Sequence, residues 1–133
     1  MEVDNIKAYM KFQTTTIQGK GRGKSLGYPT VNMFIPDDIP VLLRPGIYAA
    51  RAIIKNQIYN GALYYGPIPT FDQEESSLEI YLLDTLNFYV GLGESVEIET
   101  IKFIRGVMDF DFPELLVRQM DQDIVAIRAV LKI

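Results

Sequence analysis

The stretch that decides the fold is Gly46-Ile47-Tyr48-Ala49-Ala50-Arg51-Ala52-Ile53-Ile54, followed by Lys55-Asn56-Gln57 and residues 58–65. Residues 46–54 are apolar on both faces for part of their length, which predicts a strand that is buried there. The polar residues 55–57 can turn the chain back, and residues 58–65 can return beside the first strand, with Asn60-Gly61 as a possible bulge or turn. The sequence therefore predicts an antiparallel β-hairpin near the middle of the chain.

Working outward from this hairpin, apolar and polar residues alternate in several other segments, which predicts further strands. These segments are 6–13, with a possible extension to 17, and then 30–34, 78–83 and 96–103. In the last of them the apolar phase switches near Thr100, which indicates a bulge or bend. Between the strands we expect a turn at 36–40, a short apolar run at 41–43, a polar loop at 72–77 and a loop at 85–93.

The C-terminal segment has a different period. Pro113 suits the start of a helix, and apolar residues recur at helical spacing from Leu116 to Leu131. This pattern predicts an amphipathic helix whose apolar stripe packs on the core. About six strands followed by one helix, without internal repeats, predict a single all-β, mainly antiparallel domain over residues 1–133, either a closed barrel or a sandwich.

Composition narrows the possible functions. The 133 residues include no cysteine and no histidine. Disulfides, thiolate or histidine-ligated zinc, and Ser-His-Asp chemistry are therefore excluded, and acid–base chemistry falls to Asp, Glu, Lys or Tyr. The net charge of −4 argues against a general nucleic-acid partner. We find no signal-peptide pattern and no apolar run of membrane-spanning length, so we expect a soluble cytoplasmic monomer with no membrane partner.

A glycine-rich basic stretch opposes the overall negative charge. Its members are Gly19, Lys20, Gly21, Arg22, Gly23, Lys24 and Gly27, and Pro29, Thr30 and Asn32 follow. Glycine lets backbone N–H groups approach an anion, and Thr30 and Asn32 would place two neutral oxygens on one face of a strand. The spacing is one residue short of a Walker A loop. The stretch is therefore either a site for metal-bound phosphate or a solvated surface loop.

Two charged residues outside this stretch are candidates for chemistry. Glu79 is an acid inside an alternating strand, so its face is either solvent or a pocket. Arg105 lies near three aromatic residues in the sequence, Phe103, Phe110 and Phe112. Such residues could stack and pair with a flat aromatic ligand. The alternative is ordinary core packing with an arginine that reaches solvent.

Several short motifs occur in a characteristic order. They are Gly21-Arg22-Gly23-Lys24-Ser25-Leu26-Gly27-Tyr28-Pro29-Thr30-Val31-Asn32, Pro45-Gly46-Ile47-Tyr48, Gly66-Pro67-Ile68-Pro69-Thr70-Phe71, Leu78-Glu79-Ile80-Tyr81-Leu82-Leu83-Asp84, Tyr89-Val90-Gly91, Arg105 before Phe110, and Asp123 in the helix. In this order the chain resembles the riboflavin kinase family, either the monofunctional form or the kinase domain of bifunctional flavin-nucleotide synthases. It departs from the family pattern at Tyr81, where the family usually has His, at Val90, and at Gly106-Val107.

The resemblance implies a six-stranded closed β-barrel of riboflavin kinase type with a C-terminal helix. It also implies that riboflavin and ATP, with Mg²⁺ or another divalent cation, give FMN and ADP. Glu79 would be the general base, and Thr30 and Asn32 would hold the metal. The cofactor-binding residues would be Gly19, Lys20, Gly21, Arg22, Gly23, Lys24, Gly27 and Pro29 on the nucleotide side, and Tyr89, Arg105 and Phe110 on the flavin side.

Two other classes of function stay open on the sequence. One is a non-catalytic flavin- or nucleotide-binding barrel derived from the kinase. The other is a small oligonucleotide-binding barrel, which the acidic net charge disfavours. If the chain makes FMN, a separate FMN adenylyltransferase is the expected downstream partner.

Overall fold

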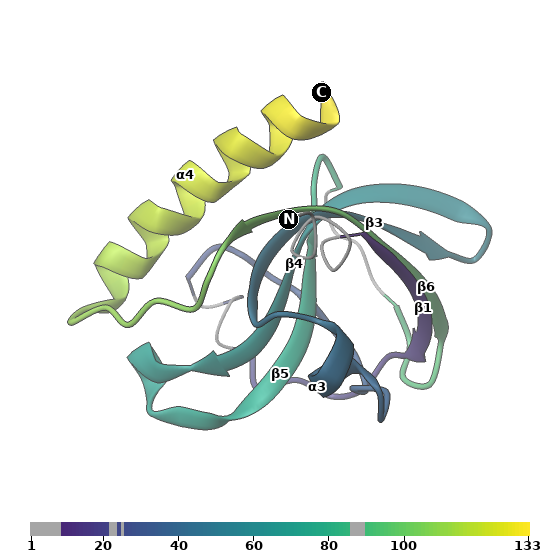
Figure 1. Ribbon diagram of the computed structural model, residues 1–133, viewed down its shortest axis with the longest axis horizontal. Helices are drawn as coiled ribbons and strands as arrows, with labels where there is room; N and C mark the ends of the chain where they lie inside the picture. Colours follow the sequence, from purple (N-terminus) through teal and green to yellow (C-terminus); the bar gives the residue numbers. More distant parts are fainter. Residues whose placement is uncertain (1–8, 22–23, 25, 86–89) are drawn as a thin grey trace.

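The computed structural model describes residues 9–21, 24, 26–85 and 90–133. Within these residues a curled sheet is crossed by one long helix (Figure 1). The elements are β1 (Met10–Thr15), β2 (Val31–Asn32), α3 (Ile39–Leu42), β3 (Gly46–Ile54), β4 (Gln57–Ile68), η1 (Pro69–Phe71), β5 (Gln73–Leu82), β6 (Ser95–Arg105) and α4 (Pro113–Leu131).

The predicted hairpin is confirmed as β3 and β4, which pair over the whole length of β3. Lys55 and Asn56 form its two-residue turn with positive φ angles of 51° and 65°, as a tight hairpin turn requires. Gly61 stays in regular register, so the possible bulge at this position is wrong. A Cβ atom there would lie 2.8 Å from the side chain of Ile80, so glycine allows the close approach of β5.

The six strands are antiparallel and follow the order β1-β6-β3-β4-β5-β2. The sheet is an open half-barrel, which corrects the closed barrel that we expected. Among the described residues, the edge strands β1 and β2 share no ladder, and an isolated bridge between Thr16 and Met33 joins the chain just beyond their ends. Because β2 contains two residues, it is too short to form a ladder along that edge.

The phase switch predicted near Thr100 is confirmed. Ala49 pairs with Lys102 and Ala50 pairs with Thr100, so one residue of β6 is extra at this point. The bulge turns the first half of β6 toward the inside of the curl, where Val96 lies buried. After it, Ile101 packs against the core on the opposite face, and a second register shift, between Ile47 and Tyr48, lets Phe103 pack in the inner core and Ile104 on the opposite face.

Several boundaries differ from the sequence predictions, and β2 (Val31–Asn32) is shorter than the strand expected at 30–34. The helix α3 lies where a turn and an apolar run were expected, and it buries Ile39 inside the curl. β4 continues beyond residue 65 to Ile68. β5 begins at Gln73, inside the segment expected as a loop. This polar segment forms a strand because Gln73 pairs with Ile68 across η1, while Glu74 keeps its side chain in solvent.

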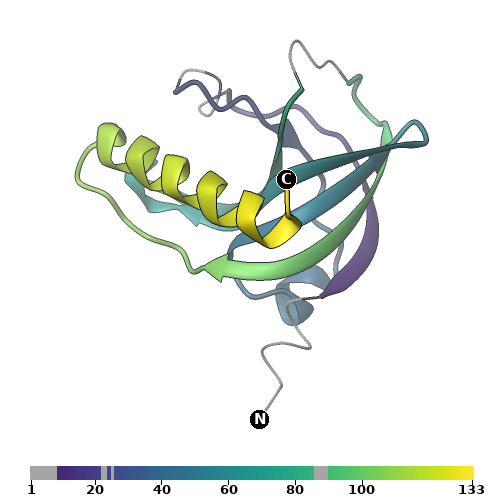
Figure 2. The same ribbon diagram turned by 90° about the horizontal axis from the view of Figure 1, so that it is seen from above.

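The sheet carries a hydrophobic core on each face. One fills the inside of the curl around Tyr48, Leu63 and Ile80. The other lies between the outer face and α4, where Ile127 and Leu131 are buried as the helical stripe predicted. Figure 2 shows α4 lying across the strands on this outer face. No helix in the described part of the chain is long and apolar enough to span a membrane.

Candidate active site

A row of side chains crosses five strands on the sheet face beneath α4. The successive cross-strand partners are Asn32 in β2, Glu79 in β5, Tyr64 in β4, Ile47 in β3 and Arg105 in β6. Directly opposed residues of antiparallel strands share a face, so these side chains are neighbours although they are far apart in the sequence. Strand pairing thus brings the expected base, one expected metal ligand and Arg105 onto one surface.

This row borders a cavity of about 450 Å³. Residues 17–21 form one wall of the cavity, and residues of η1 and the start of β5 form another. Apolar side chains of α4 complete it, including Leu116, Met120 and Ile124. The cavity therefore combines an apolar wall with a few polar groups, which is typical of a small-molecule site.

Glu79 lies partly buried against the cavity, and both of its carboxylate oxygens are hydrogen-bonded. Thr30 Oγ1 donates to Oε1 at 2.6 Å, and Ser77 Oγ donates to Oε2 at 2.8 Å. Two donors on two oxygens fix the rotation of the carboxylate plane. The alternative of an exposed strand glutamate, which the sequence left open, is therefore wrong.

The metal-binding residues expected from the sequence lie beside this carboxylate. Asn32 is the cross-strand partner of Glu79, and the hydroxyl of Thr30 donates directly to Glu79. The loop residue Gly19 passes so close that a Cβ atom would lie 2.0 Å from Asn32 Nδ2. Neutral hydroxyl and amide oxygens suit a hard cation that keeps water or phosphate ligands. Among the described residues no cluster of three acidic side chains offers a rival metal site.

The glycine-rich stretch is only partly brought to the cavity. Gly19, Lys20 and Gly21 line it, whereas Lys24, Gly27 and Pro29 do not. Gly27 has a φ angle of 89° and donates its N–H to the Lys24 carbonyl at 3.1 Å, so it forms a turn. The expected ligands Arg22 and Gly23 lie outside the described residues.

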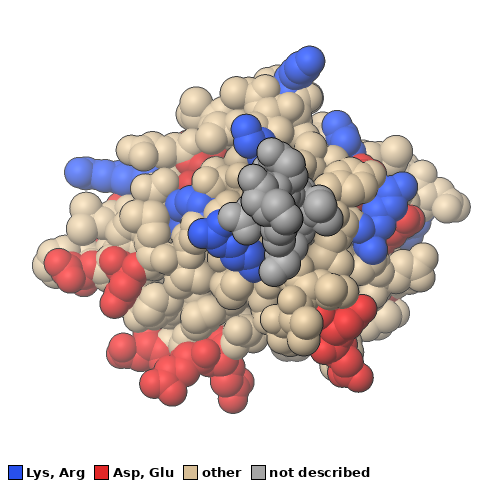
Figure 3. All heavy atoms as spheres, in the orientation of Figure 1, with Lys and Arg blue, Asp and Glu red and all other residues tan. Residues whose placement is uncertain are grey.

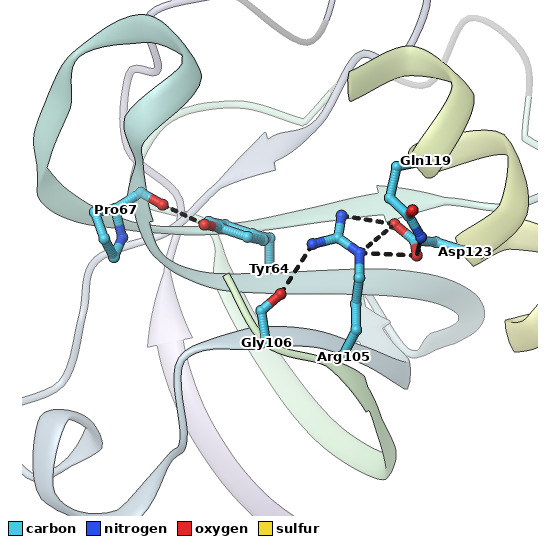
Figure 4. Close-up of polar contacts among 6 residues, drawn as sticks. All are labelled: Tyr64, Pro67, Arg105, Gly106, Gln119 and Asp123. Atoms are coloured by element: carbon cyan, nitrogen blue, oxygen red, sulfur yellow. Dashed lines mark hydrogen bonds and ion pairs between the residues drawn. The ribbon is translucent and has the colours of Figure 1, made fainter. Parts of the chain in front are cut away.

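Arg105 is held in a buried ion pair with Asp123 of α4 (Figure 4). Its Nε donates to Oδ1 at 2.9 Å and its Nη2 donates to Oδ2 at 2.8 Å. Nη1 donates to the Gly106 carbonyl, and Gln119 donates to the same carboxylate. The side chains of Arg105 and Asp123 are 14% and 3% exposed. The guanidinium is therefore fixed at the cavity wall, not extended into solvent.

Asp123 was not predicted as a site residue, although its position in the sequence indicates that it is buried. This acid lies three residues after Met120 and four before Ile127, and thus on the apolar face of α4. A carboxylate on the buried face of a helix needs a cationic or hydrogen-bonding partner. The candidate partner in the sequence was Arg105, just beyond the end of a predicted strand.

The aromatic cluster expected around Arg105 does not form. Phe103 lies on the opposite sheet face, where it packs edge-on against Tyr48 at 5.2 Å and beneath Arg44. Phe112 is exposed. Phe103 and Arg105 are two residues apart and would share a face in a regular strand, but the register shift between Ile47 and Tyr48 separates them.

The expected flavin residue Phe110 lies near the cavity but does not line it. Its backbone N–H donates to the hydroxyl of Thr70, which does line the cavity, at 3.1 Å. Tyr89, the other expected aromatic residue, lies outside the described residues.

Three tyrosines at the cavity were not anticipated as site residues. Tyr64 donates to the Pro67 carbonyl, and burial raises its pKa to about 12, while the charge of Arg105 acts in the opposite direction. Tyr28 donates to Asp121, and its ring packs edge-on against Tyr81 at a centroid distance of 5.0 Å. Burial and the bond to Asp121 raise the pKa of Tyr28.

Comparison with known proteins identifies the family of the chain. A family model described as riboflavin kinase matches residues 6–131. The chain belongs to the riboflavin kinase family. Among relatives of this family, a bifunctional riboflavin kinase/FMN adenylyltransferase of Listeria monocytogenes is 34% identical over 113 residues, which covers 82% of this chain and 34% of that protein. The RNA-binding riboflavin kinase RibR of Bacillus subtilis is 34% identical over 113 residues, with 83% of this chain and 46% of that protein covered.

Solved structures show the riboflavin kinase fold directly. A riboflavin kinase from Trypanosoma brucei superposes with a TM-score of 0.63 at 18% identity and covers 92% of this chain and 79% of that chain. A structure described as a macrolide-efflux protein from Streptococcus pneumoniae gives a TM-score of 0.71 at 28% identity, over 90% of this chain and 38% of that chain. The chain spans about a third of the length of the bifunctional relatives.

Proposed function

We propose that this chain is a riboflavin kinase that transfers the γ-phosphoryl group of ATP to the ribityl 5′-hydroxyl of riboflavin, giving FMN and ADP. The observation that carries the proposal is the position of Glu79. Its carboxylate borders the cavity, with Thr30 and Asn32 on one side and the row leading to Arg105 on the other. Family membership supports the same reaction.

Glu79 acts as the general base in this proposal. One carboxylate oxygen accepts the proton of the 5′-hydroxyl while that hydroxyl oxygen forms a bond to the γ-phosphorus. The bond between the γ-phosphorus and the bridging oxygen breaks, and ADP leaves with those electrons. The chain has no histidine, so no imidazole can take this role.

Thr30 and Asn32 would hold Mg²⁺ or a similar divalent cation on the nucleotide side. When bound, the cation supplies positive charge that neutralises the phosphate oxygens. Both side chains offer neutral oxygens next to Glu79, which fits a metal whose other ligands are phosphate and water. The hydroxyl of Thr30 can donate to Glu79 and still offer a lone pair to the metal.

We assign the remaining predicted ligands to a nucleotide side and a flavin side of this centre. On the nucleotide side, backbone N–H groups at Gly19 and Gly21 and the charge of Lys20 would receive phosphate. Arg22, Gly23, Lys24, Gly27 and Pro29 belong to the same proposed loop. On the flavin side we propose Arg105, fixed by Asp123, together with Phe110 and Tyr89. FMN made here would pass to an FMN adenylyltransferase activity, such as the one named in the bifunctional relatives.

The test is FMN formation from riboflavin, ATP and Mg²⁺, followed by chromatography. Glu79→Gln keeps the size and hydrogen-bonding capacity of the side chain but removes the base, so kcat should fall by at least about a hundredfold. Glu97→Gln is the matched control. It makes the same change in a strand acid of β6 that does not line the cavity, and its turnover should be that of the wild type.

Two results would contradict the proposal. Near-normal turnover by the folded Glu79→Gln variant would remove Glu79 as the base. Riboflavin binding without any FMN formed by the wild type would favour the non-catalytic flavin-binding barrel.

A further inference from the structure

We propose that Ser77 is a positioning residue for Glu79, holding one carboxylate oxygen so that the other stays aimed at the acceptor hydroxyl. This inference deepens the proposed function and rests on it. Ser77 lies two residues before Glu79 in β5, so both side chains leave the strand on the cavity face. Its Oγ donates to Glu79 Oε2 at 2.8 Å.

The hydroxyls of Thr30 and Ser77 both contact Glu79, but they differ in their other proposed interactions. Thr30 donates to Oε1 and is also a proposed metal ligand, so its orientation depends on the nucleotide side of the site. The bond to Glu79 is the only side-chain hydrogen bond of Ser77 within the described residues. Ser77 can therefore hold the carboxylate whatever the nucleotide side binds.

Among the described residues, Thr30 and Ser77 are the two side chains that donate to Glu79. Tyr64 is the cross-strand neighbour of Glu79, but its hydroxyl proton goes to the Pro67 carbonyl. The cross-strand partner of Ser77 is Gly66, which has no side chain to contact Glu79 or to confine Ser77. Without Ser77, Oε2 of Glu79 would have no donor within the part of the chain that the structure describes, and the side chain could turn about its terminal bonds.

Loss of this orientation should affect turnover more than binding. A base must lie within hydrogen-bond reach of its proton in the reacting geometry, and small misplacements are costly there. Riboflavin affinity depends mainly on the cavity walls, from which Ser77→Ala removes a single hydroxyl that is already bonded to Glu79. The inference therefore predicts a change in kcat with little change in KM.

The experiment compares Ser77→Ala, Ser77→Thr and the control Ser95→Ala. Ser95 is an exposed serine at the start of β6, outside the cavity. We expect Ser77→Ala to lower kcat at least about tenfold, the low end for a hydrogen bond to a charged group. The KM for riboflavin, and its dissociation constant from flavin fluorescence without nucleotide, should stay within about twofold. Ser77→Thr keeps the hydroxyl and should restore turnover, and Ser95→Ala should match the wild type.

A double variant tests whether Ser77 acts through Glu79. Because its partner is already disabled, adding Ser77→Ala to Glu79→Gln should cost little further turnover. The inference is overturned if Ser77→Ala keeps kcat within about twofold of wild type, if threonine fails to rescue, or if the two losses multiply. An active Glu79→Gln variant would instead overturn the proposed base, so the two failures are distinguishable.

Discussion

At the scale of single residues, Glu79 and Glu97 show how position decides chemistry. Both are strand glutamates that alternate with apolar neighbours. Glu97 pairs across the strands with Gln13 and Ile53, away from the cavity. Glu79 receives two hydroxyl donors and lies beside Asn32. The surroundings, not the residue type, make one of them a candidate base.

The ion pair between Arg105 and Asp123 gives a prediction at this scale. Asp123→Ala would leave the largely buried guanidinium of Arg105 without its partner, so we expect a loss of about 3–5 kcal/mol in the free energy of unfolding. Urea denaturation followed by circular dichroism measures this loss. Asp84→Asn removes the charge from the exposed ion pair with Arg128 and tolerates the positive φ angle of 57° at this position, so it serves as the control, for which we expect little change. Equal losses of unfolding free energy in the two variants would contradict the assignment of a stabilising buried ion pair to Arg105 and Asp123.

At the scale of elements, the segment before β2 is tied to α4. Tyr28 donates to Asp121 near the middle of the helix, and its ring contacts Tyr81 of β5. Thr30 follows two residues later and contacts Glu79. The packing of α4 therefore helps to set the position of the nucleotide side of the site.

Tyr28→Phe tests this tie because it keeps the ring and removes only the hydroxyl. We expect unfolding stability to fall by about 0.5–1.5 kcal/mol, with faster hydrogen exchange of the amides between residues 28 and 32. Asp121→Ala should have a similar effect, whereas Asp121→Asn keeps an acceptor and should resemble the wild type. Additive losses in the Tyr28→Phe/Asp121→Ala double variant would show that the two residues do not interact.

At the scale of the whole molecule, charge and burial are unevenly distributed. On the face shown in Figure 3, acidic side chains gather along the lower edge, where β5 and α3 lie in Figure 1, while Lys and Arg lie mainly above them. This edge would repel an anionic ligand. The interior of the curl is apolar apart from a few hydrogen-bonded groups such as Tyr48.

The buried tyrosines predict an alkaline limit to stability. Burial raises the pKa of Tyr48 and of Tyr64 to about 12 from an ordinary value of 10.0. Because the folded state keeps these protons longer than the unfolded state, their stabilisation is complete below about pH 10 and is lost as the pH rises toward about 12. The urea midpoint should fall across this range, and less steeply in Tyr48→Phe. An unchanged midpoint across this range would contradict the prediction.

The sequence by itself determined the hairpin, the bulge in β6, the amphipathic helix and the family, because these depend on local periodicity, turn chemistry and short motifs. It also singled out Glu79, Thr30 and Asn32 as candidates. Only the tertiary structure decided that the barrel stays open, that Asp123 pairs with Arg105 and that Ser77 contacts Glu79. Closure of the barrel depends on the pairing of strands that are distant in the sequence. The placement of Asp123 beside Arg105 depends on how α4 lies across the sheet. Whether two strand neighbours such as Ser77 and Glu79 meet depends on side-chain rotation, which residue spacing does not specify.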